Sequence, residues 1–375
     1  MYRIGFDAKR AFKNFSGLGN YSRSLISALS QFYTYNHYYL YTPEYKENPL
    51  LDFAQRSNIK IVTPKGLNST FSSLWRRSNI MNDIKRDNLD LFHGLSGEIP
   101  LGSSAVPTVV TIHDAIFMRY PSYYKRLDRW MYQRKFEDAC KRADKIIAIS
   151  KQTADDCIKY FNADASKIEI VYQGCDPQFY DKPSIEDIAR VKQKYNLPDR
   201  FILSVGTIEE RKNLENIVKA LPYVPADTKL VAIGRATIYT AKVIATIKLL
   251  GLEDRVKFIH NADFRDFPAI YAQSKILLYT SLFEGFGIPV LEGLNSGIPV
   301  ITSDVSSMPE AGGDAAMYVN PMDHKDIADK IDTLLSSPTL CATMVEKGYK
   351  HAQDFREDKV ADRVFDIYQS VIEKK

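Results

Sequence analysis

The stretch Ile276–Thr302, ILLYTSLFEGFGIPVLEGLNSGIPVIT, contains a complete strand–helix–strand unit. The apolar run Ile276–Tyr279 predicts a buried strand, and Pro299–Thr302 predicts the next one. Between them, Pro289 suits a first helical turn, and Asn-Ser-Gly at 295–297 ends the helix. Apolar runs without polar alternation are typical of parallel strands that are covered on both faces.

The same pattern continues through the rest of the chain. Further strands are predicted at Tyr2–Phe6, Tyr38–Tyr41, Ile59–Val62, Leu89–Phe92, Thr108–Ile112, Lys145–Ile149, Ile168–Val171, Phe201–Val205, Lys229–Ile233 and Val256–Phe258. Helical patterns such as Tyr21–Gln31, Thr153–Phe161 and Leu214–Leu221 lie between them. Strands that alternate with helices predict an α/β fold of doubly wound parallel sheets.

The pattern restarts near residue 200, after a proline-containing segment without a strand, which we interpret as a linker at about 177–200. A chain of 375 residues is long enough for two domains of similar size. We therefore predict one Rossmann-like domain at 1–177 and another at 178–360. Such sheets bind ligands beyond the carboxyl ends of their strands, so we expect a cleft between the domains.

The composition is that of a globular protein, with 45% hydrophobic and 26% charged residues. The sequence contains no run of about 18 apolar residues, so no membrane-spanning helix is predicted. The first residues predict a strand and a polar turn, not a signal peptide. The four cysteines lack metal-ligand or redox spacing, so we expect reduced thiols in a cytoplasmic protein.

The charge is unevenly distributed. Residues 1–180 carry 25 Lys and Arg against 18 Asp and Glu, whereas residues 181–375 carry 25 against 28. A basic first half favours contact with an anionic partner. A solvated surface without a partner explains the same charge.

Two glutamates, Glu284 and Glu292, flank the Gly-Phe-Gly turn at 285–287. A carboxylate near a helix N-terminus is favourable in general. That explanation accounts for one glutamate, but not for both, and not for the turn.

A second motif, LSVGTIEERKNLENI at 203–217, ends a predicted strand at Gly206 and places Arg211 and Lys212 just before a helix. Two cations beside free amides suit a diphosphate. A solvated pair balanced by Glu209 and Glu210 explains the motif equally well. The chain contains no Asp-x-Asp, the carboxylate pattern that would hold Mg²⁺, so we expect a metal-independent site.

A third motif, SGLGNYS at 16–22, follows the first strand. Gly17 and Gly19 would let a phosphate approach the backbone at a helix start. A plain turn before a helix that begins at Asn20 is the alternative. Ser22 replaces the third glycine of a dinucleotide fingerprint, and no acidic residue follows a second strand at the expected distance, which argues against a nicotinamide enzyme.

Histidines follow two of the predicted strands. His113 and Asp114 lie at the carboxyl end of Thr108–Ile112, the ligand edge of a parallel sheet. His93 lies at a similar strand end, with Glu98 nearby. A lone histidine is often structural, but this position favours a functional role for His113.

With its Glu284-x7-Glu292 spacing, the sequence resembles the retaining GT-B glycosyltransferases that carry a paired-glutamate motif (glycosyltransferase family 4, group 1). The resemblance continues through SDVSSMPEAGGDAAMYVNP, GTIEERKNL, KIEIVYQGCDPQF, ADKIIAIS and TIHDAIF. It covers most of the chain from about residue 90, together with the glycine turn. It implies two domains that close on a nucleotide-sugar donor, and a helix within 361–375 that crosses back to the first domain.

The resemblance also implies roles for individual residues. Catalytic roles fall to Glu284, His113, Arg211 and Lys212; donor contacts fall to Gly17, Gly19, Gly206, Arg211, Lys212, Phe264, Glu284, Gly285, Phe286, Gly287, Ile288 and Glu292. Arg211 and Lys212 would bind the diphosphate, Glu284 the sugar hydroxyls and Glu292 the ribose, with His113 beside the sugar. Phe264 would lie near the base. No cofactor, metal or nucleic acid is implied.

The nearest resemblance is to mannosyltransferases of bacterial surface-polysaccharide or lipopolysaccharide synthesis, which implies GDP-mannose as the donor and a saccharide or lipid-linked saccharide as the acceptor. A UDP-hexose donor is the first alternative. A GT-B sugar-nucleotide epimerase and a catalytically silent scaffold are the others.

The stretch Pro121–Arg142, PSYYKRLDRWMYQRKFEDACKR, mixes aromatic and basic residues. This composition suits an anionic membrane surface, so we consider a peripheral position at the inner face of the cell membrane. The alternative is an ordinary helix with Trp130 and Phe136 in the core.

Overall fold

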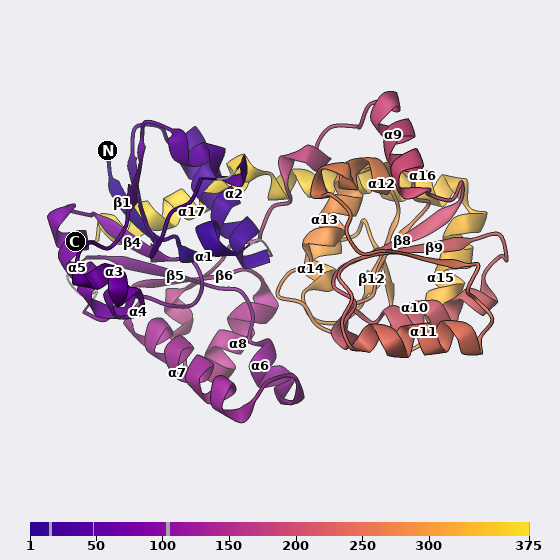
Figure 1. Ribbon diagram of the computed structural model, residues 1–375, viewed down its shortest axis with the longest axis horizontal. Coiled ribbons are helices and arrows are strands. Elements are labelled where there is room, and N and C mark those ends of the chain that lie inside the picture. Colours follow the sequence, from indigo (N-terminus) through magenta and orange to yellow (C-terminus); the bar gives the residue numbers. More distant parts are fainter. Residues whose placement is uncertain (15–16, 48, 103–105, 375) are drawn as a thin grey trace. The chain divides into compact units, whose positions relative to one another are not determined.

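The computed structural model describes residues 1–14, 17–47, 49–102 and 106–374. The chain divides into two compact units, residues 1–173 with 357–375, and residues 174–356 (Figure 1). Each unit is built on a parallel β-sheet. The predicted α/β fold with two doubly wound parallel sheets is therefore confirmed. The sequence had placed the divisions at 177/178 and 360/361.

Within the described residues, the sheet of the first unit has seven strands in the order β3-β2-β1-β4-β5-β6-β7. They are β1 (Arg3–Asp7), β2 (His37–Tyr41), β3 (Ile59–Val62), β4 (Leu91–Gly94), β5 (Thr108–Ile112), β6 (Lys145–Ala148) and β7 (Ile168–Ile170). The chain winds outward from β1 in one direction and then, from β4, in the other. The order reverses between β1 and β4, where open α/β sheets bind ligands.

Helices cover both faces of this sheet. They are α1 (Lys9–Lys13), α2 (Gly17–Phe32), α3 (Leu67–Thr70), α4 (Ser72–Leu74), α5 (Ile80–Arg86), α6 (Ile116–Arg119), α7 (Arg126–Arg142), α8 (Lys151–Phe161) and α17 (Glu357–Ile372), with short turns η1 (Pro49–Gln55), η2 (Trp75–Asn79), η4 (Pro121–Tyr123) and η5 (Ala165–Lys167). Val109 of β5 packs in one core with α2 and α17, whereas its neighbour Val110 packs in another with α7 and α8. Successive strand residues point to opposite faces, so both faces are buried.

Of the two aromatic residues of α7 that one alternative placed in the core, only Phe136 packs there. Its ring lies 5.4 Å from Phe117 and 5.3 Å from Phe161. Trp130 exposes 57% of its surface, so that alternative is wrong for Trp130.

The C-terminal helix α17 is part of the first unit. Val364, Phe365 and Tyr368 belong to the core that β1 and α2 form. The hydroxyl of Tyr368 lies 2.6 Å from Nδ1 of His93, whose Nε2 is 2.8 Å from Oγ1 of Thr111. His93 is fully buried, and burial lowers its pKa to about 3. It therefore joins α17 to the sheet as a neutral residue.

The sheet of the second unit has six strands in the described chain, in the order β10-β9-β8-β11-β12-β13. They are β8 (Phe201–Val205), β9 (Lys229–Ile233), β10 (Val256–Ile259), β11 (Leu277–Tyr279), β12 (Val300–Ser303) and β13 (Met317–Val319). Five of these were predicted. The three-residue edge strand β13 was missed because an apolar run that short gives little signal.

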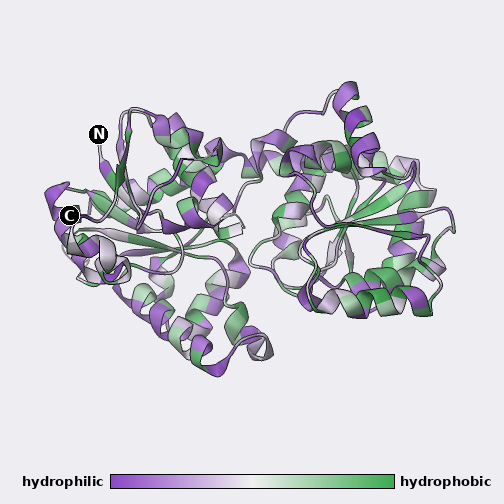
Figure 2. Cartoon of the chain, in the orientation of Figure 1, coloured by the Kyte–Doolittle hydropathy of each residue, from purple (hydrophilic) through white to green (hydrophobic). Residues whose placement is uncertain are grey.

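Helices also cover the sheet of the second unit. They are α9 (Ile185–Tyr195), α10 (Leu214–Ala220), α11 (Tyr239–Leu249), α12 (Phe267–Gln273), α13 (Ile288–Asn295), α14 (Met308–Gly312), α15 (His324–Ser336) and α16 (Pro338–Ala352), with short turns η6 (Pro177–Phe179), η7 (Glu210–Lys212), η8 (Leu221–Tyr223), η9 (Phe264–Asp266) and η10 (Gln353–Phe355). The strands of the second unit are mainly hydrophobic, whereas the helices of both units carry hydrophobic and polar residues in alternation (Figure 2). This is the distribution expected of sheets buried between helical layers.

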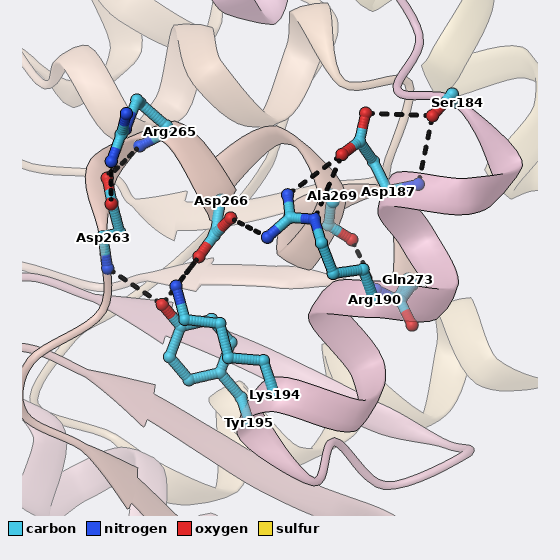
Figure 3. A network of polar contacts seen from close by, with 10 residues as sticks. All are labelled: Ser184, Asp187, Arg190, Lys194, Tyr195, Asp263, Arg265, Asp266, Ala269 and Gln273. Atoms are coloured by element: carbon cyan, nitrogen blue, oxygen red, sulfur yellow. Dashed lines mark hydrogen bonds and ion pairs between the residues drawn. The ribbon is translucent and has the colours of Figure 1, made fainter.

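The segment that we interpreted as a linker contains α9, a folded helix of the second unit. Ser184 caps the helix by accepting a hydrogen bond from the amide of Asp187 at 3.0 Å. The buried carboxylate of Asp266, in η9, accepts hydrogen bonds from Arg190, Lys194 and Tyr195 at 2.6–2.9 Å (Figure 3). Residues 185–195 are therefore fixed to the rest of the unit, and the linker interpretation is wrong for them.

We expect Asp266→Asn to lower the free energy of unfolding by about 2 kcal/mol. Burial opposes ionisation of Asp266, but the hydrogen bonds from Lys194, Tyr195 and Arg190 outweigh it and lower its pKa. An amide cannot satisfy all three donors. Urea denaturation measures the change. As a control, Asp227→Asn removes an ion pair with Arg200 on the surface and should change stability by less than about 0.5 kcal/mol. Equal losses would contradict the role of Asp266.

Candidate donor-binding site

The loop between β11 and α13 is held in one conformation by glycine and serine residues. Gly287 precedes α13 with φ +116°, and a Cβ there would lie 2.7 Å from Cε of Met308. Ser307 donates hydrogen bonds to the carbonyls of Glu284 and Phe286, both at 2.9 Å. Ser306 donates another to Glu284 O at 2.8 Å. The backbone on which Glu284 sits is therefore fixed before any ligand binds.

The side chain of Glu284 is clamped by the two cations of the second motif. Its Oε1 lies 2.6 Å from Nζ of Lys212, and its Oε2 lies 2.6 Å from Nη1 of Arg211. Nη1 of Arg211 also donates to the Phe283 carbonyl at 2.8 Å, and Nζ of Lys212 donates to Oη of Tyr279 at 2.6 Å. The structure thus brings the motif at 203–217 into contact with the paired-glutamate stretch at 276–302.

This clamp is largely buried. The side chains of Arg211, Lys212 and Glu284 expose 19%, 16% and 12% of their surface. Glu209 pairs with Nη2 of Arg211 at 2.6 Å. The alternative of a solvated cation pair is therefore wrong, although Glu209 does balance part of the charge, as that alternative had it. Two cations and two carboxylates leave this cluster formally neutral.

Burial and neighbouring charges act in opposite directions on the pKa values of Glu284 and Lys212. Burial by itself would raise the pKa of Glu284, but the charges of Lys212 and Arg211 lower it to about 2. Burial lowers the pKa of Lys212, and the charge of Glu284 opposes that change. An ionised carboxylate therefore lies beside two cations, and each could turn to a different part of a ligand.

The predicted glycines of this unit, with Phe286 and Ile288, lie in the loops beside the clamp or at the start of α13. Gly206 follows β8 with φ +135°, and a Cβ there would lie 3.4 Å from Cε of Lys212. Gly285 and Ile288 are partly exposed, whereas Phe286 is buried with its ring 5.7 Å from that of Phe355. At the start of α13, Pro289 has no amide hydrogen and the Val290 amide donates to the Gly287 carbonyl at 2.9 Å, so the amide of Ile288 is the one that this helix start can offer to an anion.

Glu292 lies on α13 and is buried. Its Oε2 accepts a hydrogen bond from Oη of Tyr271 at 2.6 Å. Burial raises the pKa of Glu292 to about 7, although the bond from Tyr271 opposes this change. Asp176 raises it further. The two glutamates of one motif therefore have opposite pKa shifts.

This shift predicts a pH dependence that belongs to Glu292. Between about pH 4.5 and 7 the folded state keeps the proton that the unfolded state loses, so the free energy of unfolding falls as the pH rises. Above about pH 7 both states have lost this proton, so Glu292 no longer changes the free energy of unfolding as the pH rises. We expect the stability difference between the wild type and Glu292→Gln to decrease from pH 5 to pH 7.5, as measured by urea denaturation. Parallel curves would show that Glu292 titrates normally.

Phe264 lies in η9, with about a third of its surface exposed. Its ring centroid lies 5.2 Å from that of Phe267 and 6.1 Å from that of Phe179. It therefore offers an aromatic face on a turn that is fixed by the Asp266 network.

His113 lies in the first unit, directly after β5. Its Nε2 is 2.9 Å from the carbonyl of Leu95, so Nε2 carries the proton. Its Nδ1 lies 3.1 Å from the side-chain amide nitrogen of Gln173, which donates to it. The ring of Tyr21 packs edge-on at 4.6 Å. Burial lowers the pKa of His113 to about 4. The imidazole is therefore neutral and fixed in one tautomer.

The two predicted glycines of the first unit lie in the first turn of α2, which begins at Gly17. The alternative, in which the helix begins at Asn20, is therefore wrong on the helix start, and Ser16 lies outside the described residues. A Cβ at Gly17 would have no atom within 4 Å, whereas a Cβ at Gly19 would lie 1.7 Å from the carbonyl oxygen of Asn14. Gly19 thus has a packing role that the sequence pattern did not indicate.

Sequence reasoning also missed several residues of the site. Tyr271 and Tyr279 are the hydrogen-bond partners of Glu292 and Lys212, and Ser306 and Ser307 hold the Glu284 loop. Tyr279 ends a predicted strand at the ligand edge of the sheet and could have been included for that reason. The two serines come after β12, and only the fold brings them to the loop.

In the described part of the chain, no three His, Cys, Asp or Glu side chains gather so that they could hold a metal ion. Among the same residues, no helix is long and apolar enough to cross a bilayer.

Comparison with solved structures identifies the fold. The Anabaena protein Alr3699/HepE in complex with UDP and glucose has a TM-score of 0.76 at 19% identity, over 99% of this chain and 100% of that one. WaaG, a glycosyltransferase involved in lipopolysaccharide biosynthesis, has a TM-score of 0.71 at 18% identity, over 98% and 99%. The architecture is the GT-B fold of glycosyltransferases, as the sequence predicted.

Two family models cover most of the sequence. "Glycosyltransferase Family 4" matches residues 15–179, and "Glycosyl transferases group 1" matches residues 186–351. The chain therefore belongs to the glycosyltransferases that these two models describe, family 4 and group 1.

Curated relatives are similar over part of their lengths. O-antigen chain mannosyltransferase B of Escherichia coli is 26% identical over 285 residues, 74% of each chain. O-antigen chain mannosyltransferase RfbU of Salmonella typhimurium is 27% identical over 61% of each chain. The serotype-specific mannosyltransferase WbdA of Escherichia coli is 30% identical over 65% of this chain, which spans only 31% of that longer relative.

Proposed function

We propose that the protein is a retaining mannosyltransferase. It would transfer mannose from GDP-mannose to a saccharide or lipid-linked saccharide acceptor in the synthesis of a surface polysaccharide or lipopolysaccharide. The observation that carries the proposal is the buried clamp of Glu284 by Arg211 and Lys212. The names of the three curated relatives support mannose as the sugar.

In this proposal, the partners of the clamp separate when the donor binds. The donor diphosphate, a stronger anion than one carboxylate, would take Arg211 and Lys212 together with the Ile288 amide at the start of α13. Glu284 would then turn to the hydroxyls of the mannose, because an ionised carboxylate accepts hydrogen bonds and donates none. The two cations would then pair with the diphosphate, and the carboxylate of Glu284 would keep hydrogen-bond partners in the sugar hydroxyls, so no buried charge would lack a partner.

The cations would lower the barrier as the diphosphate leaves. Negative charge grows on the phosphate oxygen as the bond to C1 of the sugar breaks, and Arg211 and Lys212 would stabilise that charge without a metal. The acceptor hydroxyl would form its bond to C1 on the same face, with its proton passing to the departing phosphate. This route keeps the configuration at C1, as a retaining enzyme requires.

Other residues would place the rest of the donor. Glu292 would bind the ribose hydroxyls and Phe264 would lie near the base. The neutral His113 would lie beside the sugar, and Gly17 and Gly19 near the diphosphate. Because its two ring nitrogens already have partners, His113 would position the sugar rather than accept a proton.

A thermal-shift panel of GDP- and UDP-sugars tests the donor. A ligand that binds only the folded state raises the melting temperature by mass action. We expect GDP-mannose and GDP to raise it, and UDP-glucose and UDP not to do so. A shift with UDP compounds alone would replace GDP-mannose by a UDP-hexose.

Product analysis tests the reaction type. Incubation with GDP-mannose alone should release GDP and mannose slowly, as water takes the place of the acceptor. Conversion to another GDP-sugar without release of GDP would instead identify an epimerase.

A further inference from the structure

Helix α12 places one buried tyrosine against the second glutamate of the paired-glutamate stretch. Oη of Tyr271 donates a hydrogen bond to Oε2 of Glu292 at 2.6 Å. Within the described part of the chain, this is the one hydrogen bond that either side chain makes. One carboxylate oxygen of Glu292 is therefore held in place, and the other, Oε1, is left for a ligand.

The ring of Tyr271 is fixed by its surroundings. Tyr271 is fully buried, and the ring of Phe179 packs edge-on against it with the centroids 5.3 Å apart. The ring of Phe267, one turn earlier on α12, lies 6.4 Å away. Burial and the charge of Glu292 raise the pKa of the Tyr271 hydroxyl well above its usual value. The hydroxyl therefore keeps its proton throughout the neutral range and acts on Glu292 as a donor.

The charge of Glu292 depends on opposing influences. Burial favours the neutral carboxyl, whereas the hydrogen bond from Tyr271 favours the ionised form. Asp176, just before η6, favours the neutral form as well, and the charge of Lys212 favours the ionised one. Of these three side chains, Tyr271 is the one that makes a hydrogen bond to the carboxyl group in the described structure. Its loss would therefore change both the charge and the orientation of Glu292.

We propose that Tyr271 is a positioning residue of the donor site, whose hydroxyl holds Glu292 ionised through Oε2 so that Oε1 accepts hydrogen bonds from the ribose hydroxyls. The inference rests on the proposed function, in which the ribose is the ligand of Glu292. An ionised carboxylate accepts at both oxygens, and hydrogen bonds to it are stronger than those to a neutral group. Below about pH 7, donor binding therefore releases the proton of Glu292 to the solvent.

The affinity ratio of two ligands measures this role in the full chain. GDP-mannose and its 2′,3′-dideoxy analogue share the base, the diphosphate and the mannose, so their ratio isolates the ribose hydroxyls at each pH. By calorimetry, we expect the wild type to prefer GDP-mannose. The ratio should rise about tenfold from pH 6 to pH 8, as Glu292 becomes ionised.

Tyr271→Phe removes one oxygen atom and keeps the ring. It should lower the ratio about fivefold at pH 7.5 and move its rise to higher pH, because the ionised carboxylate loses its donor. Affinity for the dideoxy analogue should be unchanged. A defect of packing alone would instead weaken the binding of both ligands alike at every pH. Circular dichroism checks that the variant is folded.

Tyr239→Phe is the matched control. The hydroxyl of Tyr239 also donates to a carboxylate, Oε2 of Glu215 at 3.3 Å, but neither residue has an assigned contact with the donor. We expect this variant to keep the wild-type ratio at every pH. A loss like that of Tyr271→Phe would show that the effect does not depend on the contact with Glu292, and the proposal would be wrong.

Proton release provides a second measurement that needs no variant of Tyr271. Calorimetry at pH 6.5, in two buffers of different ionisation enthalpy, counts the protons released on binding. GDP-mannose should release roughly one proton more than the dideoxy analogue does, because only its ribose hydroxyls require the ionised carboxylate. Equal proton counts for the two ligands would overturn the proposal.

Failure of the inference differs from failure of the proposed function. If the wild type prefers GDP-mannose and Tyr271→Phe keeps its ratio at every pH, the role of Tyr271 is wrong, and ribose binding by Glu292 stands. Equal wild-type affinities for the two ligands would overturn ribose binding itself, and the inference with it. If only UDP-sugars bind, UDP-glucose and its 2′,3′-dideoxy analogue give the same test, because both kinds of donor contain the ribose.

Discussion

Glu284→Gln is expected to lower kcat/KM for mannosyl transfer by about a thousandfold. The amide keeps the shape of the side chain but loses its charge. It would bind the sugar hydroxyls weakly, and it would no longer compete with the diphosphate for Arg211 and Lys212. GDP affinity, measured by calorimetry, should therefore be kept or increased while turnover is lost. Lys212 and Arg211 hold the pKa of the wild-type carboxyl well below its usual range, whereas the amide does not ionise, so no pH change should restore the variant.

Glu209→Gln is the matched control for this experiment. Glu209 pairs with the same guanidinium at 2.6 Å, through the other terminal nitrogen, but has no assigned contact with the donor. We expect less than about a tenfold loss of turnover. If both variants lost activity equally, the effect would come from the charge balance around Arg211, and the role of Glu284 at the sugar would be wrong.

Local patterns predicted most of the fold, because most strands are continuous apolar runs that can be recognised in the sequence without knowledge of their partners. The elements that were missed depend on partners far along the chain. Helix α9 carries helix signals of its own, with a Ser184 cap and Ile188 and Val191 three residues apart, but the prolines on either side of it favoured the linker interpretation. Its anchor Asp266 comes more than 70 positions later, so the local sequence does not show that the helix is fixed to the second unit.

The candidate site shows the same limit. Arg211 and Glu284 were each singled out, but they are 73 positions apart in the sequence. They meet because β8 and β11 are neighbours in the sheet, so the loops that follow these strands leave it side by side. The sequence therefore predicted the chemical groups and the ligand edge, but not that the cations hold the carboxylate before a donor arrives.

Gly19→Ala is expected to lower the free energy of unfolding by about 3 kcal/mol, even without any ligand. The added Cβ would lie 1.7 Å from the carbonyl oxygen of Asn14 and 3.0 Å from that of Arg10. Both are backbone atoms, and Arg23 holds the Asn14 carbonyl by a hydrogen bond at 2.8 Å. Because neither atom can move alone, α1 would have to shift against α2. The melting temperature should fall by roughly 6–12 °C.

Gly17→Ala is the control that separates packing from donor binding. Gly17 lies in the same helical turn, but its Cβ would meet no atom within 4 Å. Alanine there should change stability by less than about 1 kcal/mol, in the stabilising direction. If both variants unfold alike and Gly19→Ala loses only its thermal shift with GDP-mannose, then Gly19 serves the phosphate and the packing argument is wrong. If Gly19→Ala loses stability with no donor present, the close approach of α2 to Asn14 is sufficient to require the glycine.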